Sequence, residues 1–404
     1  MTDLPTLPSG ARIRAARRRD GRPQAAIAGL CGISTDYLSK IERGLKKPSG
    51  EVLVALAAEL QVKVATLLGD PGVEAGAEPP TAPRSTVVQA LLQRHDAALA
   101  PLPAAVLRTR VEQAWKAWQT SSHRFTEAEA LLPDLIGDVE GTLRALRTGS
   151  APAERREVLR VSADLYGLLR SYYRRIGRLD LSLMAADRAL RAAEDADDPL
   201  RMGAARWNLG HVLLAQPGSE RDAVDVAMDA SRDLAAAVDP SEAAAVRGAL
   251  ELVAVVADAR ARRPWAARER LTARAVPLAR RSGENNRNSM WTVFGPTNVA
   301  LHALSVEMTN GDAVEGLRLA DQIDVSALPS RERKFTFGLE VARCYDLRRD
   351  DAAVLVHLLE LEQLAPEDLE RSPLGRQLVV DLLRRVRPTY RQQATGIAER
   401  LHLV

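Results

Sequence analysis

Cysteine, aromatic side chains and long apolar runs are scarce in this sequence of 404 residues. The two cysteines, Cys31 and Cys344, lie far apart among apolar neighbours at helical spacing, which is typical of buried free thiols and argues against a disulfide. Phe, Trp and Tyr make up only 4% of the chain, so few residues prefer a strand. No apolar run approaches the roughly 18 residues of a membrane-spanning helix, and no signal peptide opens the chain. We therefore expect a cytoplasmic protein without a membrane partner.

The sequence motifs of catalysis are missing as well. There is no glycine-rich phosphate loop, no Gly-x-Ser-x-Gly turn, no His-Glu-x-x-His sequence and no acidic pair in a context resembling a cleft. Four of the six histidines stand without Cys or carboxylate partners at metal-ligand spacing: His95, His123, His357 and His402. The sequence therefore predicts a protein that is not an enzyme and that holds neither a cofactor nor a metal ion.

The residues that are abundant favour helices. Ala, Leu and Arg are frequent and no strand-like alternation persists, so we predict an all-α protein. At about 100–200 residues per domain, the length suggests two or three folded units. Residues 1–70 contain 11 Lys and Arg against 7 Asp and Glu, whereas the remainder is balanced at 45 against 46. This local basic excess makes a polyanion such as DNA a plausible partner.

Proline and glycine punctuate the chain into four parts: residues 1–69, a Pro- and Gly-rich linker at 70–85, a bridging segment at 86–150 and a repeat region at 151–404. The first part reads as five short helices. The bridging segment predicts two or three helices, whose Trp115, Trp118 and Phe125 we assign to a core that caps the repeats.

Weak self-similarity at a spacing of about 34–42 residues runs through the repeat region. One unit carries Tyr166, Leu169, Tyr173, Gly177, Ala186 and Ala189, and the next carries Leu209, Gly210, Leu213, Gly218, Ala223, Ala227 and Ala230. Three more degenerate units follow at residues 242–282, 297–324 and 333–365. Small side chains recur where two antiparallel helices must approach closely, so five helix pairs in an α-solenoid are predicted, and their pattern resembles tetratricopeptide (TPR) repeats.

The most specific pattern lies between Gln24 and Gly44. Its apolar positions, which can bury one shared face, are Ile27, Ala28, Ile33, Leu38 and Ile41. Gly32 permits a tight turn between two helices and Ser34 can cap the second of them. The pattern is extended by Pro48, Leu53, Leu56, Ala57 and Leu60. Over about 60 residues, the sequence resembles the helix-turn-helix domain of the Xre (Cro/lambda-repressor-like) family. With the TPR-like half, the layout is similar to that of actinobacterial Xre regulators.

The resemblance implies which residues contact DNA: Gln24, Ser34, Thr35, Asp36, Tyr37, Ser39, Lys40, Arg43, Lys46 and Lys47. In the family the second helix lies in the major groove, so Thr35, Asp36 and Lys40 are expected at base edges, with Tyr37 and Ser39 beside them. The expected phosphate contacts are Gln24, Arg43, Lys46 and Lys47. Arg17 and Glu42 occupy the positions of an interhelical ion pair, to which an exposed pair would contribute about 0–1 kcal/mol.

Four polar residues in the repeats suggest an effector site. Asn208 with His211 and Asn298 with His302 each put an amide and an imidazole on one face of a predicted helix, and an amide can both donate to and accept from a peptide group. Tyr166 and Tyr173 are added to this candidate site. The alternative, which stays open, is that these side chains form hydrogen bonds between repeats or face water.

These observations predict a homodimeric transcriptional regulator that binds an inverted-repeat operator in double-stranded DNA and is nucleoid-associated when bound. Its repeats would sense a peptide or small-molecule effector, as the family resemblance implies. Two alternatives are a DNA-bound scaffold whose repeats recruit a partner protein without a small ligand, and an adaptor that does not bind DNA.

Overall fold

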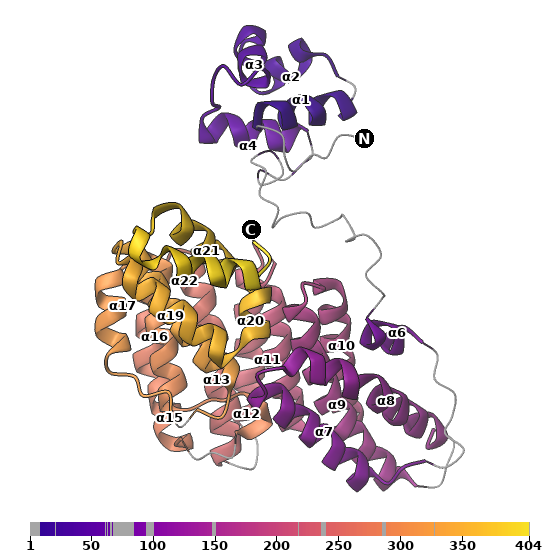
Figure 1. Ribbon diagram of the computed structural model, residues 1–404. Helices are drawn as coiled ribbons and strands as arrows, with labels where there is room; N and C mark the ends of the chain where they lie inside the picture. Colours follow the sequence, from indigo (N-terminus) through magenta and orange to yellow (C-terminus); the bar gives the residue numbers. More distant parts are fainter. Residues whose placement is uncertain are drawn as a thin grey trace. The chain divides into compact units, whose positions relative to one another are not determined.

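The computed structural model describes residues 9–20, 22–60, 62, 64, 67, 85–93, 101–147, 151–216, 218–235, 240–284, 288–326 and 328–403. The chain divides into two compact units, Met1–Pro83 and Arg84–Val404. Every regular element in the described ranges is helical, which confirms the all-α prediction (Figure 1). Within those same ranges, no helix is both long enough and apolar enough to span a bilayer.

The first unit is a small bundle whose helices are α1 (Ser9–Asp20), α2 (Gln24–Leu30), α3 (Thr35–Glu42) and α4 (Gly50–Glu59). Its core is built by Ile13, Ile27, Leu38, Ile41 and Leu56, each with none of its surface exposed. The fifth predicted helix falls largely outside the described residues, and so does almost all of the predicted linker at 70–85.

The second unit contains the remaining elements. They are α6 (Thr86–Leu92), α7 (Ala104–Thr120), α8 (Arg124–Ala145), α9 (Pro152–Arg175), α10 (Leu179–Asp195), α11 (Pro199–Leu214), α12 (Glu220–Ala235), α13 (Pro240–Arg260), α14 (Pro264–Arg270), a π-helical turn at Leu271–Ala275, α15 (Val276–Ser282), a 3-10 turn at Ser289–Trp291, α16 (Pro296–Asn310), α17 (Ala313–Ala320), α18 (Arg331–Leu347), α19 (Asp351–Leu364), α20 (Pro366–Arg371), α21 (Pro373–Arg385) and α22 (Pro388–Arg400).

The five predicted repeat units correspond to successive helix pairs: α9 with α10, α11 with α12, α13 with α14 and α15, α16 with α17, and α18 with α19. Helices α9 to α13 pack side by side in chain order (Figure 1). Gly177 and Gly311 have positive φ angles of 78° and 83° at the turns within two pairs, a conformation that costs glycine little. Buried Ala185, Ala186 and Ala189 let α10 approach its neighbours closely.

The bridging segment forms α6, α7 and α8, and its aromatic residues are core, as predicted. Trp115, Trp118 and Phe125 are 4%, 2% and 3% exposed. Trp118 meets Phe125 and Tyr172 of α9 edge to face, at centroid distances of 5.2 and 5.9 Å. These contacts join the bridging helices to the first repeat.

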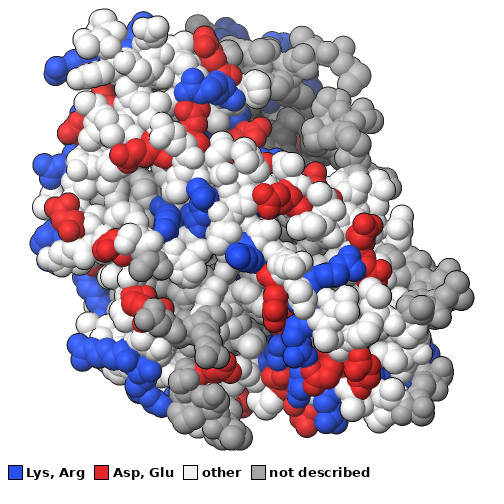
Figure 2. Space-filling model, turned by 60° about the horizontal axis from the view of Figure 1, so that its bottom comes forward, with Lys and Arg blue, Asp and Glu red and all other residues white. Residues whose placement is uncertain are grey.

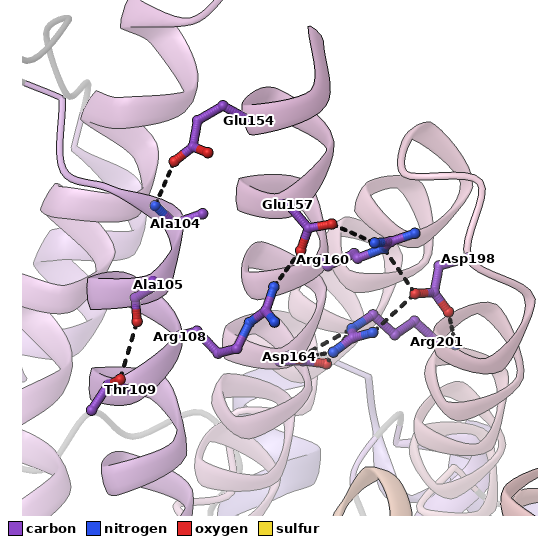
Figure 3. Close-up of polar contacts among 10 residues, drawn as sticks. All are labelled: Ala104, Ala105, Arg108, Thr109, Glu154, Glu157, Arg160, Asp164, Asp198 and Arg201. Carbon is purple, nitrogen blue, oxygen red and sulfur yellow. Dashed lines mark hydrogen bonds and ion pairs between the residues drawn. The ribbon is translucent and has the colours of Figure 1, made fainter. Parts of the chain in front are cut away.

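A chain of ion pairs runs across α7, α9 and α11 (Figure 3) and consists of Arg108, Glu157, Arg160, Asp198, Arg201 and Asp164. Arg201 ties α11 to α9, because its guanidinium lies 2.8 Å from Asp164 and 2.9 Å from Asp198. Burial raises the pKa of Asp164 to about 6 although Arg201 opposes that shift. The network fixes the register of these three helices, and each of its six charged side chains is paired with another member.

The start of the second unit also contacts its end. The backbone N–H of Phe125 donates to Glu367 at 2.7 Å, and Arg331 Nε donates to the carbonyl of Thr120 at 2.8 Å. Helix α7 packs on α18. The two ends of this row of helix pairs therefore meet, and its inner surface lines a partly open cavity.

Candidate functional site

Helix α3 presents a polar face on a firmly held helix. The hydroxyl of Ser34 accepts a hydrogen bond from the backbone N–H of Tyr37 at 3.1 Å, which is the predicted N-cap. Gly32 takes a positive φ of 66° in the turn before it. Leu38 and Ile41 bury the inner side of the helix completely. Its outer side is therefore free to contact a partner.

The predicted base-reading residues lie on that outer side. Thr35 and Asp36 are exposed, and Tyr37, Ser39 and Lys40 are partly exposed. Lys40 Nζ lies 2.6 Å from the Asp36 carboxylate, and this hydrogen bond holds the pKa of Asp36 below its usual value. Because the two side chains are paired with each other, either can contact a base only if this ion pair opens or is shared with the base.

Cations follow α3 directly. Arg43, Lys46 and Lys47 are all exposed. Lys46 Nζ lies 5.8 Å from the centroid of the Tyr37 ring, and Arg43 Nε donates to the Ser39 carbonyl at 3.3 Å. The end of the helix and the loop after it thus form a basic edge beside the polar face.

Glu42 connects the helices of the first unit. Arg17 Nε lies 2.6 Å from its carboxylate, which confirms the predicted ion pair, and Gln24 Nε2 donates to it at 2.7 Å. Burial favours a raised pKa for Glu42, but the hydrogen bonds from Arg17 and Gln24 outweigh it and lower the pKa. Only 2% of the Glu42 side chain is exposed, so the small contribution expected of an exposed pair underestimates it.

Gln24 makes a contact that the sequence did not reveal. One N–H of its amide is engaged by Glu42. An amide nitrogen carries two N–H groups, so the second remains to donate to a phosphate.

The structure separates the six predicted effector residues. Tyr166 and Tyr173 are 2% and 0% exposed, and their hydroxyls donate to Glu140 at 2.6 Å and to the Val87 carbonyl at 2.9 Å. Both of these described side chains lie in the core, and neither lines the cavity that contains His211 and His302. Asn208, only 6% exposed, accepts from Arg170, which matches the alternative of hydrogen bonding between repeats.

His211 and His302 do come together, because both line a cavity of about 300 Å³ inside the second unit. His302 Nδ1 donates to the backbone carbonyl of Asn298 at 2.8 Å. Burial, followed by the charge of Arg333, lowers the pKa of His302 to about 3, and burial lowers that of His211 strongly. Both rings are therefore neutral at neutral pH.

The walls of this cavity come from α7, α9, α11, α13, α16 and α18 and from the segment Trp291–Val293. The residues that sequence reasoning missed are its arginines. Arg170, Arg174 and Arg175 recur on a helix whose neighbouring positions are apolar and buried. Charged residues in such a stretch were the available signal, since arginine is seldom placed in a core without a partner.

Residues 13–67 match the family model described as Helix-turn-helix (HTH_3). Over 60 residues, 15% of this chain and 54% of the relative, the chain is 40% identical to the transcriptional regulator ClgR of Mycobacterium tuberculosis. Over 64 residues, 16% of this chain and 46% of the relative, it is 38% identical to an uncharacterized HTH-type transcriptional regulator of the same species. The matches thus span about half the length of these curated relatives. The first unit contains an Xre-like helix-turn-helix domain, as predicted.

One solved structure aligns along most of the chain. The crystal structure of Bacillus thuringiensis PlcR in complex with the peptide PapR7 and DNA covers 88% of this chain and 98% of its own, at 12% identity and a TM-score of 0.32. A likeness at this level identifies neither a shared arrangement nor a shared ligand. The helix pairs of the second unit are established by the contacts between their own helices, independently of this likeness.

Proposed function

We propose that this chain is a cytoplasmic, non-enzymatic transcriptional regulator that binds double-stranded DNA through α3 and whose second unit dimerises and senses an effector. The observation that carries the proposal is the polar outer face of α3, on a helix whose inner side is fully buried and whose end is basic. A rigid helix with polar side chains at its N-terminal end suits the major groove. The family match and the names of the relatives support this reading.

Thr35, Asp36 and Lys40 would read base edges. A lysine can donate to guanine O6 and N7, an aspartate can accept from cytosine N4, and a threonine can contact a thymine methyl group. Each good pair discriminates against a wrong base by about 1–3 kcal/mol. Because Asp36 and Lys40 are paired in the free protein, a base gains affinity where it replaces or shares their mutual contact.

Gln24, Arg43, Lys46 and Lys47 would position the helix on the phosphate backbone. The exposure of the three cations and the second N–H of the Gln24 amide support this assignment. Such contacts carry affinity and salt dependence but no sequence information.

Two copies of the chain would bind an inverted repeat, since operator symmetry mirrors dimer symmetry. An effector in the second unit would then shift DNA affinity. A coupling of about 1–3 kcal/mol changes affinity about 5- to 150-fold.

The second candidate function is a DNA-bound scaffold that recruits a protein. One observation favours it: a hollow of about 400 Å³ in the second unit is lined largely by apolar side chains, among them Leu317, Val325, Phe337, Val341 and Leu361. A protein-docking surface is expected to be broader and more apolar than a small-ligand site. Recruitment through this hollow would require no small ligand.

Selection of bound duplexes from a random DNA pool by the full chain tests the proposal. We expect enrichment of a palindromic site whose affinity falls steeply with salt. The Gln24→Ala variant should lower recovery, and Lys116→Ala, which removes an exposed lysine on α7, serves as the matched control. No enrichment with or without cell extract, together with identical behaviour of both variants, would favour the adaptor that does not bind DNA.

A further inference from the structure

The interior cavity of the second unit is lined by more positive than negative side chains. Five arginines face two glutamates in its wall. The arginines are Arg170, Arg174 and Arg175 from α9, Arg260 from α13 and Arg333 from α18. On the face drawn in Figure 2, by contrast, Lys and Arg side chains are interspersed with Asp and Glu side chains. The cavity wall carries an excess of positive side chains.

Both glutamates of the wall are already engaged. Glu332 pairs with Arg175 and also with Arg124, whose guanidinium lies 2.9 Å away. Glu340 lies 3.9 Å from Arg343, and burial raises the pKa of Glu340, which favours its neutral form. Little negative charge is left for the other arginines.

The other arginines are less fully neutralised. Arg174 lies 3.8 Å from Glu332, which is already paired twice. Arg260 donates to the backbone carbonyl of Leu214. Arg170 donates to the amide oxygen of Asn208. Among the described residues, the guanidinium of Arg333 has no ion pair. The Nε atoms of Arg170, Arg174 and Arg175 are buried without a hydrogen-bond partner in those same residues. Buried donors without a partner are costly.

The cations also repel one another. Burial lowers the pKa of Arg174 to about 10, and the charges of Arg333, Arg124 and Arg260 add to the shift. Burial alone lowers the pKa of Arg333 to about 10. An anion inside the cavity would relieve this repulsion, and its attraction to guanidinium groups would be strong because little water intervenes.

The cavity offers a flat apolar wall beside the charges. The rings of Trp115 and Trp291 stack at 4.9 Å with 4° between their planes. The guanidinium of Arg170 lies 5.4 Å from the centroid of the Trp207 ring. A volume of about 300 Å³ is at the lower end of the range of small-molecule sites, about 300–1,000 Å³.

The geometry points to this cavity as the binding site of a small organic anion, which presents a carboxylate or phosphate group to Arg170, Arg174 and Arg333 and a planar apolar part to Trp115 and Trp291. The role of that anion as an effector rests on the proposed function, whereas its binding does not.

The test is the melting temperature of the full chain with phenyl phosphate, benzoate or neutral benzyl alcohol, followed by tryptophan fluorescence. All five tryptophans belong to the second unit, so the signal reports on that unit. We expect the melting temperature to rise with the concentration of one anion and not with benzyl alcohol. Whether phosphate or benzoate is preferred distinguishes the two anionic groups.

Two variants decide the assignment. Arg333→Gln should weaken anion binding at least 10-fold. Without ligand, this variant should melt no lower than the wild type, because the change removes a half-buried charge that has no ion pair in the described chain. Arg174→Gln gives a second measure, and Arg191→Gln, on the exposed side of α10, is the control. No shift with either anion, a shift only with a short acidic peptide, or an unchanged response of both cavity variants would overturn the inference.

The anion site and the proposed function can be contradicted independently of each other. Anion binding with DNA selection unaffected by the anion supports the site and removes the effector role. DNA enrichment without any anion binding supports the regulator and overturns the site.

Discussion

The guanidinium of Arg124 lies 2.9 Å from the carboxylate of Glu332, which follows it by 208 positions. The same guanidinium, on a residue that is 1% exposed, pairs with Asp368 and lies 4.3 Å from the centroid of the Trp118 ring. One side chain of α8 thereby joins α18 and α20. This contact closes the ring of helix pairs around the cavity.

Replacing Arg124 by Ala should therefore weaken the second unit. Asp368 would remain buried without its counter-charge, and breaking a buried ion pair in this way costs about 3–5 kcal/mol. Urea denaturation followed by tryptophan fluorescence measures the loss. Arg191→Ala, which breaks an exposed pair on α10, should change stability by no more than about 1 kcal/mol. Equal effects of the two changes would argue against the closed ring.

Stability should fall as the pH is lowered from 6.5, in part because of His302. The unfolded chain binds a proton at this residue near its ordinary pKa of 6.5, whereas the folded chain does not until the pH reaches about 3. The stability present above pH 6.5 is therefore lost progressively toward pH 3, at up to about 1.4 kcal/mol per pH unit for one proton.

Denaturation curves at several pH values check this prediction. His302→Gln should reduce the slope of stability against pH by about one proton, and His123→Gln, an exposed histidine at the start of α8, should not. The same slope in all three proteins would mean that His302 is protonated as readily in the folded chain as in the unfolded one.

In the first unit, Glu42→Gln should destabilise the helix-turn-helix by about 3 kcal/mol, since it removes the partner of Arg17 from a partly buried pair. Hydrogen exchange of the amides of α2 and α3 reports this unit, which has no tryptophan. Glu59→Gln breaks the more exposed pair with Arg22 and should cost within about 1 kcal/mol. The prediction is wrong if both variants exchange alike.

Lys46→Ala and Lys47→Ala should each weaken DNA binding to a similar degree on every sequence. Loss of one phosphate contact lowers the slope of log affinity against log salt by about 0.9. Titrations at several salt concentrations measure that slope, with Lys116→Ala as the control. A changed base preference in either variant would instead make that lysine a reader of bases.

Features that depend on residues close together in the sequence could be predicted from it. The Ser34 cap, the Gly32 turn and the buried face of α3 all depend on spacings of a few positions, and each is present. The five helix pairs follow from the recurrence of small residues at helix contacts. Local patterns of this kind determine elements whatever the rest of the chain does.

The cavity could not be predicted, because it depends on contacts between distant residues. Nothing near Arg124 in the sequence indicates Glu332 or Asp368. Tyr166 and Tyr173 matched the repeat pattern, but that pattern does not distinguish a side chain on the cavity wall from one in the core. His211 and His302 line one cavity because α11 and α16 both pack on α13, and this cannot be read from either helix alone.

The measurement that tests the central claim most directly is the base preference of the Thr35→Ala, Asp36→Ala and Lys40→Ala variants, determined by duplex selection from a random pool. The account predicts a palindromic site for the wild type, with preference relaxed at particular base pairs, by about 1–3 kcal/mol each, in each variant. Lys47→Ala should keep the wild-type preference at lower affinity. Identical preferences in all four variants and the wild type would contradict the claim that α3 reads DNA.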